Sequence, residues 1–163
     1  MKMNDAVRSS VTSDLKYRAE VDWDGQTGGK CRFGDSVQGL KYTLNLDKPT
    51  EFGGKGDFPS PCSIFFSGLA GCLLTTFLYA KERMRLEIKD LKVNVEANVK
   101  STMVSGYYLD SIRAVVYVIV DNEVDRAKAL RCGEFVKSYS FALRALQAGT
   151  KIDLITQATV EPS

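Results

Sequence analysis

Alternating apolar and polar residues near the start of the chain predict a small sheet. From Leu15 to Trp23, apolar residues occupy every odd position and charged residues every even one. A period of two is typical of a strand with one face on a core and the other in water. The alternation returns at Leu40–Leu46, and Lys30–Phe33 is a short strand candidate between them. We therefore predict three antiparallel strands in a meander.

A long segment without charge follows, from Pro61 to Ala80. Ser60 is a suitable N-cap, and Pro61 fits the first helical turn. The run from Lys81 to Arg85 is mostly cationic and would stand at the negative end of the helix dipole. These signals predict one helix over residues 60–85.

The large apolar side chains of this helix point in nearly all directions instead of forming one stripe. They are Phe65, Phe66, Leu69, Leu73, Leu74, Phe77 and Leu78. A helix of this kind must be covered on every side. A membrane span is the competing interpretation, because the uncharged run is close to the minimum length. The interspersed Gly, Ser and Thr residues and the alternating segments downstream favour a soluble core helix, with no membrane partner.

The rest of the chain combines strands and helices. We predict strands over Leu91–Lys100 and Leu109–Val120 with a hairpin at Ser105-Gly106, a helix from Asp121 or Asn122 to Lys137, a short helix around Ser140–Gln147, and a closing strand over Lys151–Val160. The segment from Ala114 to Val120 is apolar at every position, which indicates a central strand covered on both faces.

This order predicts an α+β fold with antiparallel sheets around a long buried central helix. One sheet and two later helices cannot surround that helix, so we expect an intertwined homodimer. Residues 1–14 are expected to be a flexible tail and residues 15–163 a single domain. The N-terminal segment lacks the apolar core of a signal peptide, so a reducing cytoplasm is the expected compartment.

Composition narrows the chemistry. The 163 residues include no histidine, which removes Ser-His-Asp and Cys-His catalysis and His-ligated zinc. A net charge of +2 without a long basic block argues against nucleic-acid binding. The four cysteines form no C-x-x-C pair, so neither a metal site nor another cofactor is predicted. Thiol chemistry is the sharpest remaining option.

Two of the four cysteines, Cys62 and Cys72, lie on the predicted central helix. Cys62 stands in the first turn, where free N–H groups favour a thiolate, so local physics ranks it above Cys72. Cys72 needs a neighbouring cation to become reactive, and a buried packing residue is the alternative interpretation. Ten residues of straight helix separate the two by about 15 Å, which excludes a disulfide between them. Cys132 is expected to pack a helix.

Several motifs occur together in order along the chain. They are Asp47-Lys48-Pro49, Gly53-Gly54, Phe58-Pro59-Ser60-Pro61, the run from Phe65 to Leu73, the strand Asp90–Glu96 and the closing segment Ser138–Leu146. Together they resemble the OsmC/Ohr superfamily (osmotically inducible protein C, organic hydroperoxide resistance). That family carries a proline eleven residues before its reactive cysteine, as Pro61 stands to Cys72. The resemblance covers residues 15–160.

The resemblance implies a swapped, intertwined α+β homodimer with active sites at the interface. In peroxidase members, one cysteine attacks the hydroperoxide and becomes a sulfenic acid, and a second cysteine resolves it as a disulfide that dithiols reduce. An arginine paired with a glutamate lowers the pKa of the first thiol.

The family's site residues carry over incompletely. Cys72 matches the reactive position. The closing motif places the resolving position at Ser140, and serine cannot form a disulfide. The glutamate position falls on Cys62, and the best candidate for the arginine is Arg32, with Lys30 second. The chain therefore resembles a branch that lacks the second cysteine.

Two functions remain open on these residues. The first is a thiol-dependent peroxidase that reduces organic hydroperoxides or hydrogen peroxide through Cys72 in oxidative stress defence. Its sulfenic acid would be reduced by an external thiol or dithiol, or by Cys62 if the partner chain brings that thiol close. The alternative is a non-catalytic protein whose cleft at the dimer interface holds an apolar or thiol-bearing small molecule. Ser140 separates the two, because it argues against a complete two-cysteine cycle.

Overall fold

The computed structural model describes residues 16–104 and 106–162. The chain divides between Pro61 and Cys62 into two compact units. The predicted tail over residues 1–14 and the predicted hairpin residue Ser105 lie outside the described residues. That the two units combine into the single domain expected over residues 15–163 stays a prediction.

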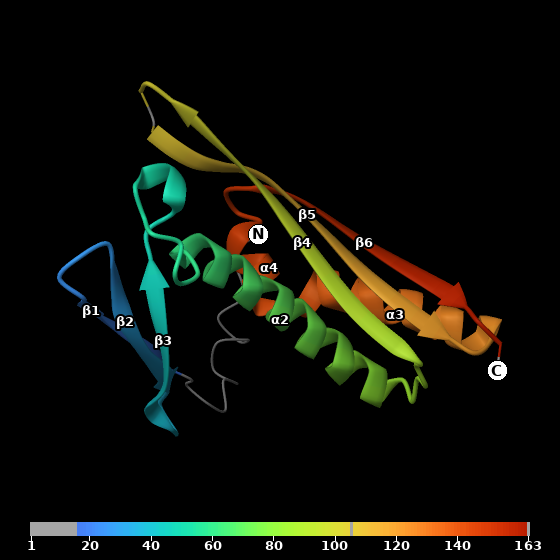
Figure 1. The fold of residues 1–163 in the computed structure, drawn as a ribbon. Coiled ribbons are helices and arrows are strands. Elements are labelled where there is room, and N and C mark those ends of the chain that lie inside the picture. The colour runs from blue at the N-terminus through green and yellow to red at the C-terminus, as the bar shows by residue number, and fades with distance from the viewer. Residues whose placement is uncertain (1–15, 105, 163) are drawn as a thin grey trace, which may run out of the picture. The chain divides into compact units, whose positions relative to one another are not determined.

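The first unit is a three-stranded antiparallel meander, as the alternation predicts. Its strands are β1 (Tyr17–Trp23), β2 (Gly28–Asp35) and β3 (Gly39–Asp47), in the order β1-β2-β3 (Figure 1). Val21 pairs with Cys31, which pairs with Leu44, so these apolar side chains share one face. That face is poorly covered within the chain, since Val21 is 58% exposed and Trp23 76% exposed.

A buried carboxylate organises the loop after β3. Asp47 accepts hydrogen bonds from the backbone N–H groups of Lys48, Lys55 and Gly56, each at 2.8 Å. A hydrogen bond from the Thr27 side chain and these N–H groups hold the pKa of Asp47 below its ordinary value, although burial opposes the shift. The loop also contains the 3-10 turn η1 (Thr50–Phe52). The Gly-rich segment is thus tied to the end of β3.

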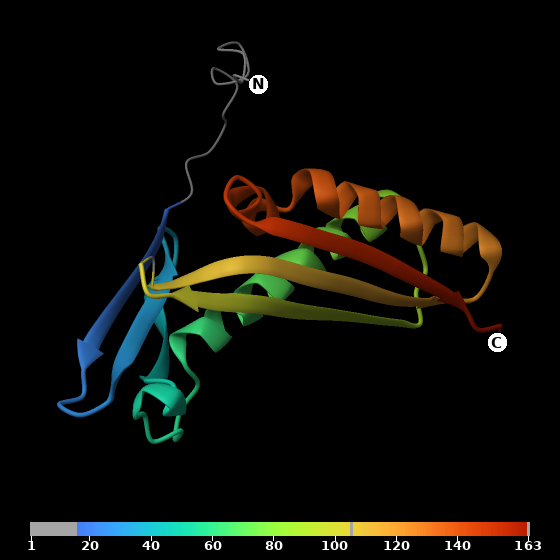
Figure 2. The same ribbon diagram turned by 90° about the horizontal axis from the view of Figure 1, so that it is seen from above.

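The second unit packs helices on one sheet. It contains the central helix α2 (Pro61–Arg83), the hairpin β4 (Asp90–Thr102) and β5 (Gly106–Val120), helices α3 (Glu123–Tyr139) and α4 (Phe141–Leu146), and the closing strand β6 (Lys151–Val160). Figures 1 and 2 show the three strands side by side, with β5 in the middle.

The sheet of the second unit is mixed, which corrects the expectation of antiparallel sheets. β4 and β5 are antiparallel, but β6 runs parallel to β5, with Ile112 opposite Ile152. The reason is the connection: helices α3 and α4 carry the chain from the end of β5 back to its beginning, and such a crossover produces a parallel pair.

The core lies on one face of this sheet. Alternate residues of β5 are buried against side chains of α2 and α3. Val116 of β5, Phe77 of α2 and Val136 of α3 are all fully buried in this core. The opposite face of β5 is less covered than its apolar sequence indicates, because Arg113 and Tyr117 are exposed there. The burial predicted for both faces from Ala114 onward is therefore wrong for Tyr117 within one chain, whereas Val115 is buried.

Helix α2 begins at Pro61 as predicted and ends two residues before the predicted Arg85. Arg85 has a positive φ of 47°. The N–H of Leu86 donates to the carbonyl of Lys81 at 3.0 Å, and the N–H of Arg85 to that of Glu82 at 3.2 Å. This pair of bonds is the Schellman ending, with Arg85 in the left-handed position that glycine usually takes.

Only one stripe of α2 is buried within the chain. Leu69, Leu73, Phe77 and Ala80 are at most 2% exposed, whereas Phe65 is 52% exposed. Within the described residues, α2 is also the one helix long and apolar enough to cross a membrane by length and composition, with a mean hydropathy of 1.7. The core helix of a soluble protein meets the same test, so this property is weak evidence for a membrane.

Candidate functional site

The central contact of the candidate site joins α2 to the junction of α3 and α4. The Sγ of Cys72 lies 3.5 Å from the Oγ of Ser140, and either atom can be the donor. Cys72 is half-buried, whereas Ser140 is fully buried. Two residues that are 68 positions apart in the sequence thus meet inside the second unit.

Ser140 is held in place by the two helices that it joins. Its backbone N–H donates to the carbonyl of Val136 at 3.0 Å, which closes α3. Its side-chain oxygen accepts from the N–H of Leu143 at 3.5 Å as the N-cap of α4. Because this bond uses a lone pair of the hydroxyl oxygen, the O–H remains able to donate toward Cys72. A hydroxyl in that position can stabilise a thiolate or the sulfenic acid formed from it.

Cys62 does not join this pair within the chain. It is exposed in the first turn of α2, and Cys72 follows ten residues later on the same unbroken helix. The helical rise separates the two by about 15 Å. An intrachain disulfide between them is therefore excluded, as the sequence predicts.

Arg32 and Lys30 belong to β2 of the first unit. The guanidinium of Arg32 forms ion pairs with Glu20 and Asp22, each at 3.2 Å. Both partners are carboxylates of β1, so the cation already has acidic neighbours within its own sheet. The role of Arg32 or Lys30 beside the Cys72 thiol stays a prediction.

The remaining two cysteines, Cys31 and Cys132, are partly or fully buried. Cys132 is fully buried in the core, which confirms the expected packing role, and burial raises the pKa of its thiol. Cys31 is partly buried on the apolar face of the first sheet. Among the described residues, no group of three or more Cys, Asp or Glu side chains could hold a metal ion.

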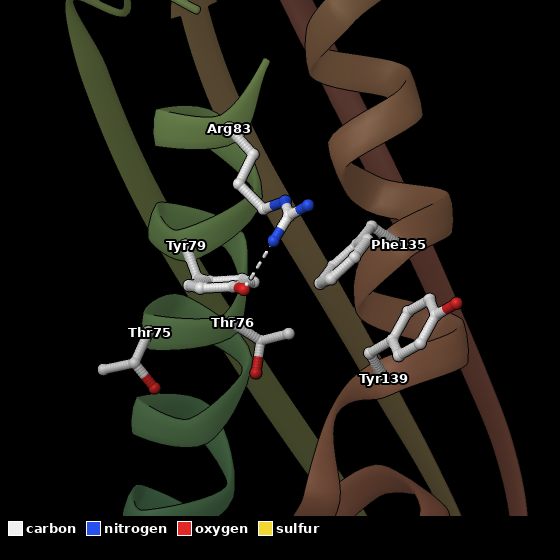
Figure 3. Close-up of a pocket in the computed structure, with 6 residues that line it drawn as sticks. All are labelled: Thr75, Thr76, Tyr79, Arg83, Phe135 and Tyr139. Atoms are coloured by element: carbon white, nitrogen blue, oxygen red, sulfur yellow. Dashed lines mark hydrogen bonds between the residues drawn. The ribbon is translucent and has the colours of Figure 1, made fainter. Parts of the chain in front are cut away.

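A groove between α2 and α3 was not predicted from the sequence. It has a volume of about 580 Å³ and is lined by Thr75, Thr76, Tyr79, Arg83, Phe135 and Tyr139 (Figure 3). The Phe135 ring stacks on Tyr139 at 4.3 Å between centroids and lies 5.9 Å from Tyr79. The groove begins beside the central contact, because Thr76 is one turn after Cys72 and Tyr139 precedes Ser140.

A spacing in the sequence could have revealed this groove. Thr76, Tyr79 and Arg83 follow Cys72 by four, seven and eleven residues, which places all four on one face of a helix. The sequence alone indicates for the Arg83 region only an interaction with the helix dipole, and no local pattern in α3 shows that this helix faces α2.

A family model described as OsmC-like protein matches residues 54–155, which is more than half of the chain. The chain belongs to the OsmC-like protein family. No curated protein matches it. The predicted family is therefore correct, whereas a separate branch without the second cysteine remains an interpretation of Ser140.

Solved structures share the OsmC-like fold at low sequence identity. An OsmC-like protein from Mycoplasma pneumoniae matches with a TM-score of 0.67 and 19% identity, over 93% of this chain and 100% of that chain. An organic hydroperoxide resistance protein from Elizabethkingia anophelis, with thiocyanate bound, matches with a TM-score of 0.69 and 11% identity, over 91% and 100%. These likenesses confirm the α+β OsmC-like fold.

A third structure carries a ligand. It is described as a candidate organic hydroperoxide resistance protein from Vibrio cholerae, with captopril bound in one of its active sites. It matches with a TM-score of 0.64 and 17% identity, over 90% of this chain and 94% of that chain.

The OsmC-like fold explains why Cys72 and Ser140 can be paired from the sequence. The family motifs place the reactive position on the central helix and the second position at the start of the last helix. The resemblance assigns those positions to Cys72 and Ser140 in this chain, and the side chains of these two residues are in contact. Because Ser140 carries a hydroxyl and not a thiol, no disulfide can form within this pair.

Proposed function

We propose that this OsmC-family protein is a thiol-dependent peroxidase that reduces organic hydroperoxides or hydrogen peroxide through Cys72 and works with a single reactive cysteine. The observation that carries the proposal is the contact of 3.5 Å between the half-buried Cys72 thiol and the Ser140 hydroxyl. Such a thiol is accessible enough to meet a small oxidant, and its neighbour can donate a hydrogen bond to a charged sulfur.

The proposed first step is a two-electron oxidation of Cys72. The thiolate attacks one peroxide oxygen, the S–O bond forms and the O–O bond breaks. The thiol becomes a sulfenic acid, and the peroxide leaves as an alkoxide that takes up a proton to become the alcohol. With hydrogen peroxide as substrate, the leaving group becomes water.

The second step must come from outside the site, because Ser140 cannot form a disulfide. An external thiol attacks the sulfenic sulfur, which releases water and forms a mixed disulfide. A second thiol, or the second sulfur of a dithiol, then releases the Cys72 thiol and leaves as the oxidised disulfide. A reducing cytoplasm would supply such thiols, and we propose that compartment for the protein.

We also propose that two copies form an intertwined homodimer. The exposed surface of α2 includes Phe65, and the apolar face of the first sheet includes Val21 and Trp23, which are more than half exposed in one chain. Exposed apolar surface on each unit is typical of an interface between subunits. Light scattering at several protein concentrations should give twice the mass of 18.0 kDa, and a monomer at every concentration would contradict the dimer.

A second candidate function is binding without turnover. The groove between α2 and α3, with a volume of about 580 Å³, has the size of a small-molecule site. In this alternative, Cys72 contacts or packs near a ligand and is not oxidised in the protein's normal role.

A turnover assay distinguishes the two functions. Purified protein is given cumene hydroperoxide with either a monothiol or a dithiol, and the loss of peroxide is followed. The peroxidase proposal predicts turnover with both reductants, loss of turnover in Cys72→Ser, and retention in Cys62→Ser. Equal background rates for wild type and Cys72→Ser would rule out the peroxidase and favour binding alone.

A further inference from the structure

The groove between α2 and α3 contains a charged group that the proposed peroxidase chemistry does not use. Among the described residues that line it, Arg83 is the single charged side chain. Its guanidinium forms no ion pair among the salt bridges of the described residues, in contrast to Arg32 and Arg126. A cation facing a groove without a carboxylate partner provides electrostatic complementarity for an anion.

The Arg83 side chain is oriented by its neighbour on the helix. Its Nη1 donates to the hydroxyl oxygen of Tyr79 at 2.9 Å, and the guanidinium lies 5.6 Å from the centroid of the Tyr79 ring. Long side chains on a helix point back toward its N-terminus. The cation therefore stands near the level of Tyr79, on the side of the helix that Figure 3 shows facing Phe135 and Tyr139.

Apolar surface separates this cation from the thiol. Tyr79, Phe135 and Tyr139 form an aromatic wall. The ring centroids of Tyr79 and Phe135 are 5.9 Å apart, and those of Phe135 and Tyr139 are 4.3 Å apart. Cys72 precedes Tyr79 by seven residues, which is about 10 Å along the helix axis. The groove thus presents a cation and an aromatic wall, and Cys72 lies one helical turn before Thr76, which lines the groove.

We propose that this groove selects organic anions: a carboxylate binds Arg83, and an apolar chain lies along the aromatic wall toward Cys72. Arg83 is then a specificity-determining residue that favours hydroperoxides carrying a distant carboxylate over neutral ones. The kinetic part of this inference rests on the proposed peroxidase function, whereas the binding part does not. Arg83 retains four further N–H donors after its bond to Tyr79, so its fork can receive both carboxylate oxygens.

The binding part is tested with Cys72→Ser protein, which cannot turn over. Calorimetry measures the affinity for decanoate and for 1-decanol, below the concentration at which either aggregates. We expect decanoate to bind, Arg83→Gln to weaken that binding at least tenfold, and Arg83→Lys to recover part of it. The affinity for 1-decanol should stay within twofold in all variants. Arg131→Gln, which removes an exposed cation of α3 outside the groove, is the matched control and should change neither affinity.

Two results of the calorimetry overturn the inference. One is an unchanged decanoate affinity in Arg83→Gln protein, which would show that the cation does not receive the carboxylate. The other is no decanoate binding at all, as expected if a second copy of the chain fills the groove.

The kinetic part uses a matched pair of oxidants, 10-hydroperoxydecanoate and decyl hydroperoxide, with wild-type protein. We expect Arg83→Gln to slow oxidation of Cys72 by the carboxylate-bearing peroxide about tenfold and to leave the rate with the neutral one unchanged. Equal slowing with both peroxides overturns the selectivity. If Cys72 reacts with neither peroxide, the peroxidase proposal fails, whereas the decanoate result still decides the anion site.

Discussion

The thiol of Cys72 and the hydroxyl of Ser140 lie 3.5 Å apart, although 68 residues separate them in the chain. The contact depends on both long elements of the second unit, because α2 supplies the sulfur and the α3–α4 junction supplies the oxygen. The hydroxyl of Ser140 stands beside the Cys72 thiol, where a second thiol would be needed to form a disulfide in a two-cysteine cycle. Under the proposed peroxidase function, the pair therefore determines which reductant can complete the cycle.

Replacing Ser140 with cysteine tests this geometry. The two side-chain atoms are close enough that a small movement brings sulfur atoms to the disulfide bond length of about 2.05 Å. We expect Ser140→Cys protein to form a disulfide between Cys72 and the introduced thiol after one equivalent of hydroperoxide. Peptide mapping without reductant detects the link.

The matched control for that experiment is Ser138→Cys, at an exposed position of α3 two residues away. Its new thiol should remain free under the same treatment. Failure of Ser140→Cys to cross-link, in protein that is folded by circular dichroism, would contradict the observed contact.

Gly133 tests how α3 packs on β6. A Cβ at this position would come within 2.0 Å of the Thr156 Oγ1 and 2.7 Å of its Cβ. We expect Gly133→Ala to lower the free energy of unfolding by about 1–3 kcal/mol through overpacking, despite the better helix propensity of alanine. Urea unfolding measures the change.

The matched control for Gly133 is Gly149→Ala, because a Cβ at Gly149 meets no atom within 4 Å. That variant should be within about 0.5 kcal/mol of wild type. Equal stability of Gly133→Ala and Gly149→Ala would mean that α3 lies farther from β6 than the structure indicates.

Gly71 tests whether a second copy covers α2. A Cβ at this exposed glycine meets no atom within 4 Å in the single chain. If α2 of another chain approaches there, Gly71→Ala should weaken dimerisation about tenfold, since close approach of helices needs small residues. Analytical ultracentrifugation measures the dissociation constant. An unchanged constant, together with a more stable helix, would place the dimer contact elsewhere.

The lowered pKa of Asp47 predicts that the loop after β3 loses stability in acid. Because its pKa is lowered in the folded protein, the carboxylate contributes stability that is complete above its ordinary value of 3.8 and is lost as the pH falls through the folded pKa. We expect amide exchange at Lys55 and Gly56 to accelerate over that acidic range. In Asp47→Ala protein, exchange should already be fast at pH 7. Protection at these amides that is the same in both proteins at pH 7 would contradict the role of Asp47.

Much of the fold can be predicted from local patterns in the sequence. The alternation in β1 and β4, the proline in the first turn of α2 and the N-cap Asn122 act within a few residues, so they identify the elements directly. The side-chain oxygen of Asn122 accepts from the N–H of Asp125 at 2.9 Å, as expected for an N-cap. The parallel pairing of β6 is a property of the path through α3 and α4, which no local pattern specifies.

The candidate site is predictable to a smaller extent for the same reason. Cys72 and Ser140 were found through family motifs, because the fold fixes their relative positions. The groove depends on which face of α3 turns toward α2, and that is decided by the packing of residues such as Cys132 and Val136 in the core. Arg83 therefore becomes a candidate only when the two helices are seen together.

The rate at which hydroperoxide oxidises Cys72 in a single turnover tests the central claim most directly. Stopped-flow mixing with cumene hydroperoxide, followed by dimedone trapping and mass spectrometry, identifies the oxidised thiol. The proposed peroxidase predicts one sulfenic acid per chain, located at Cys72, formed at least a hundredfold faster than an ordinary free thiol reacts, and absent in Cys72→Ser. Oxidation of Cys72 no faster than that of the exposed Cys62 would contradict the claim.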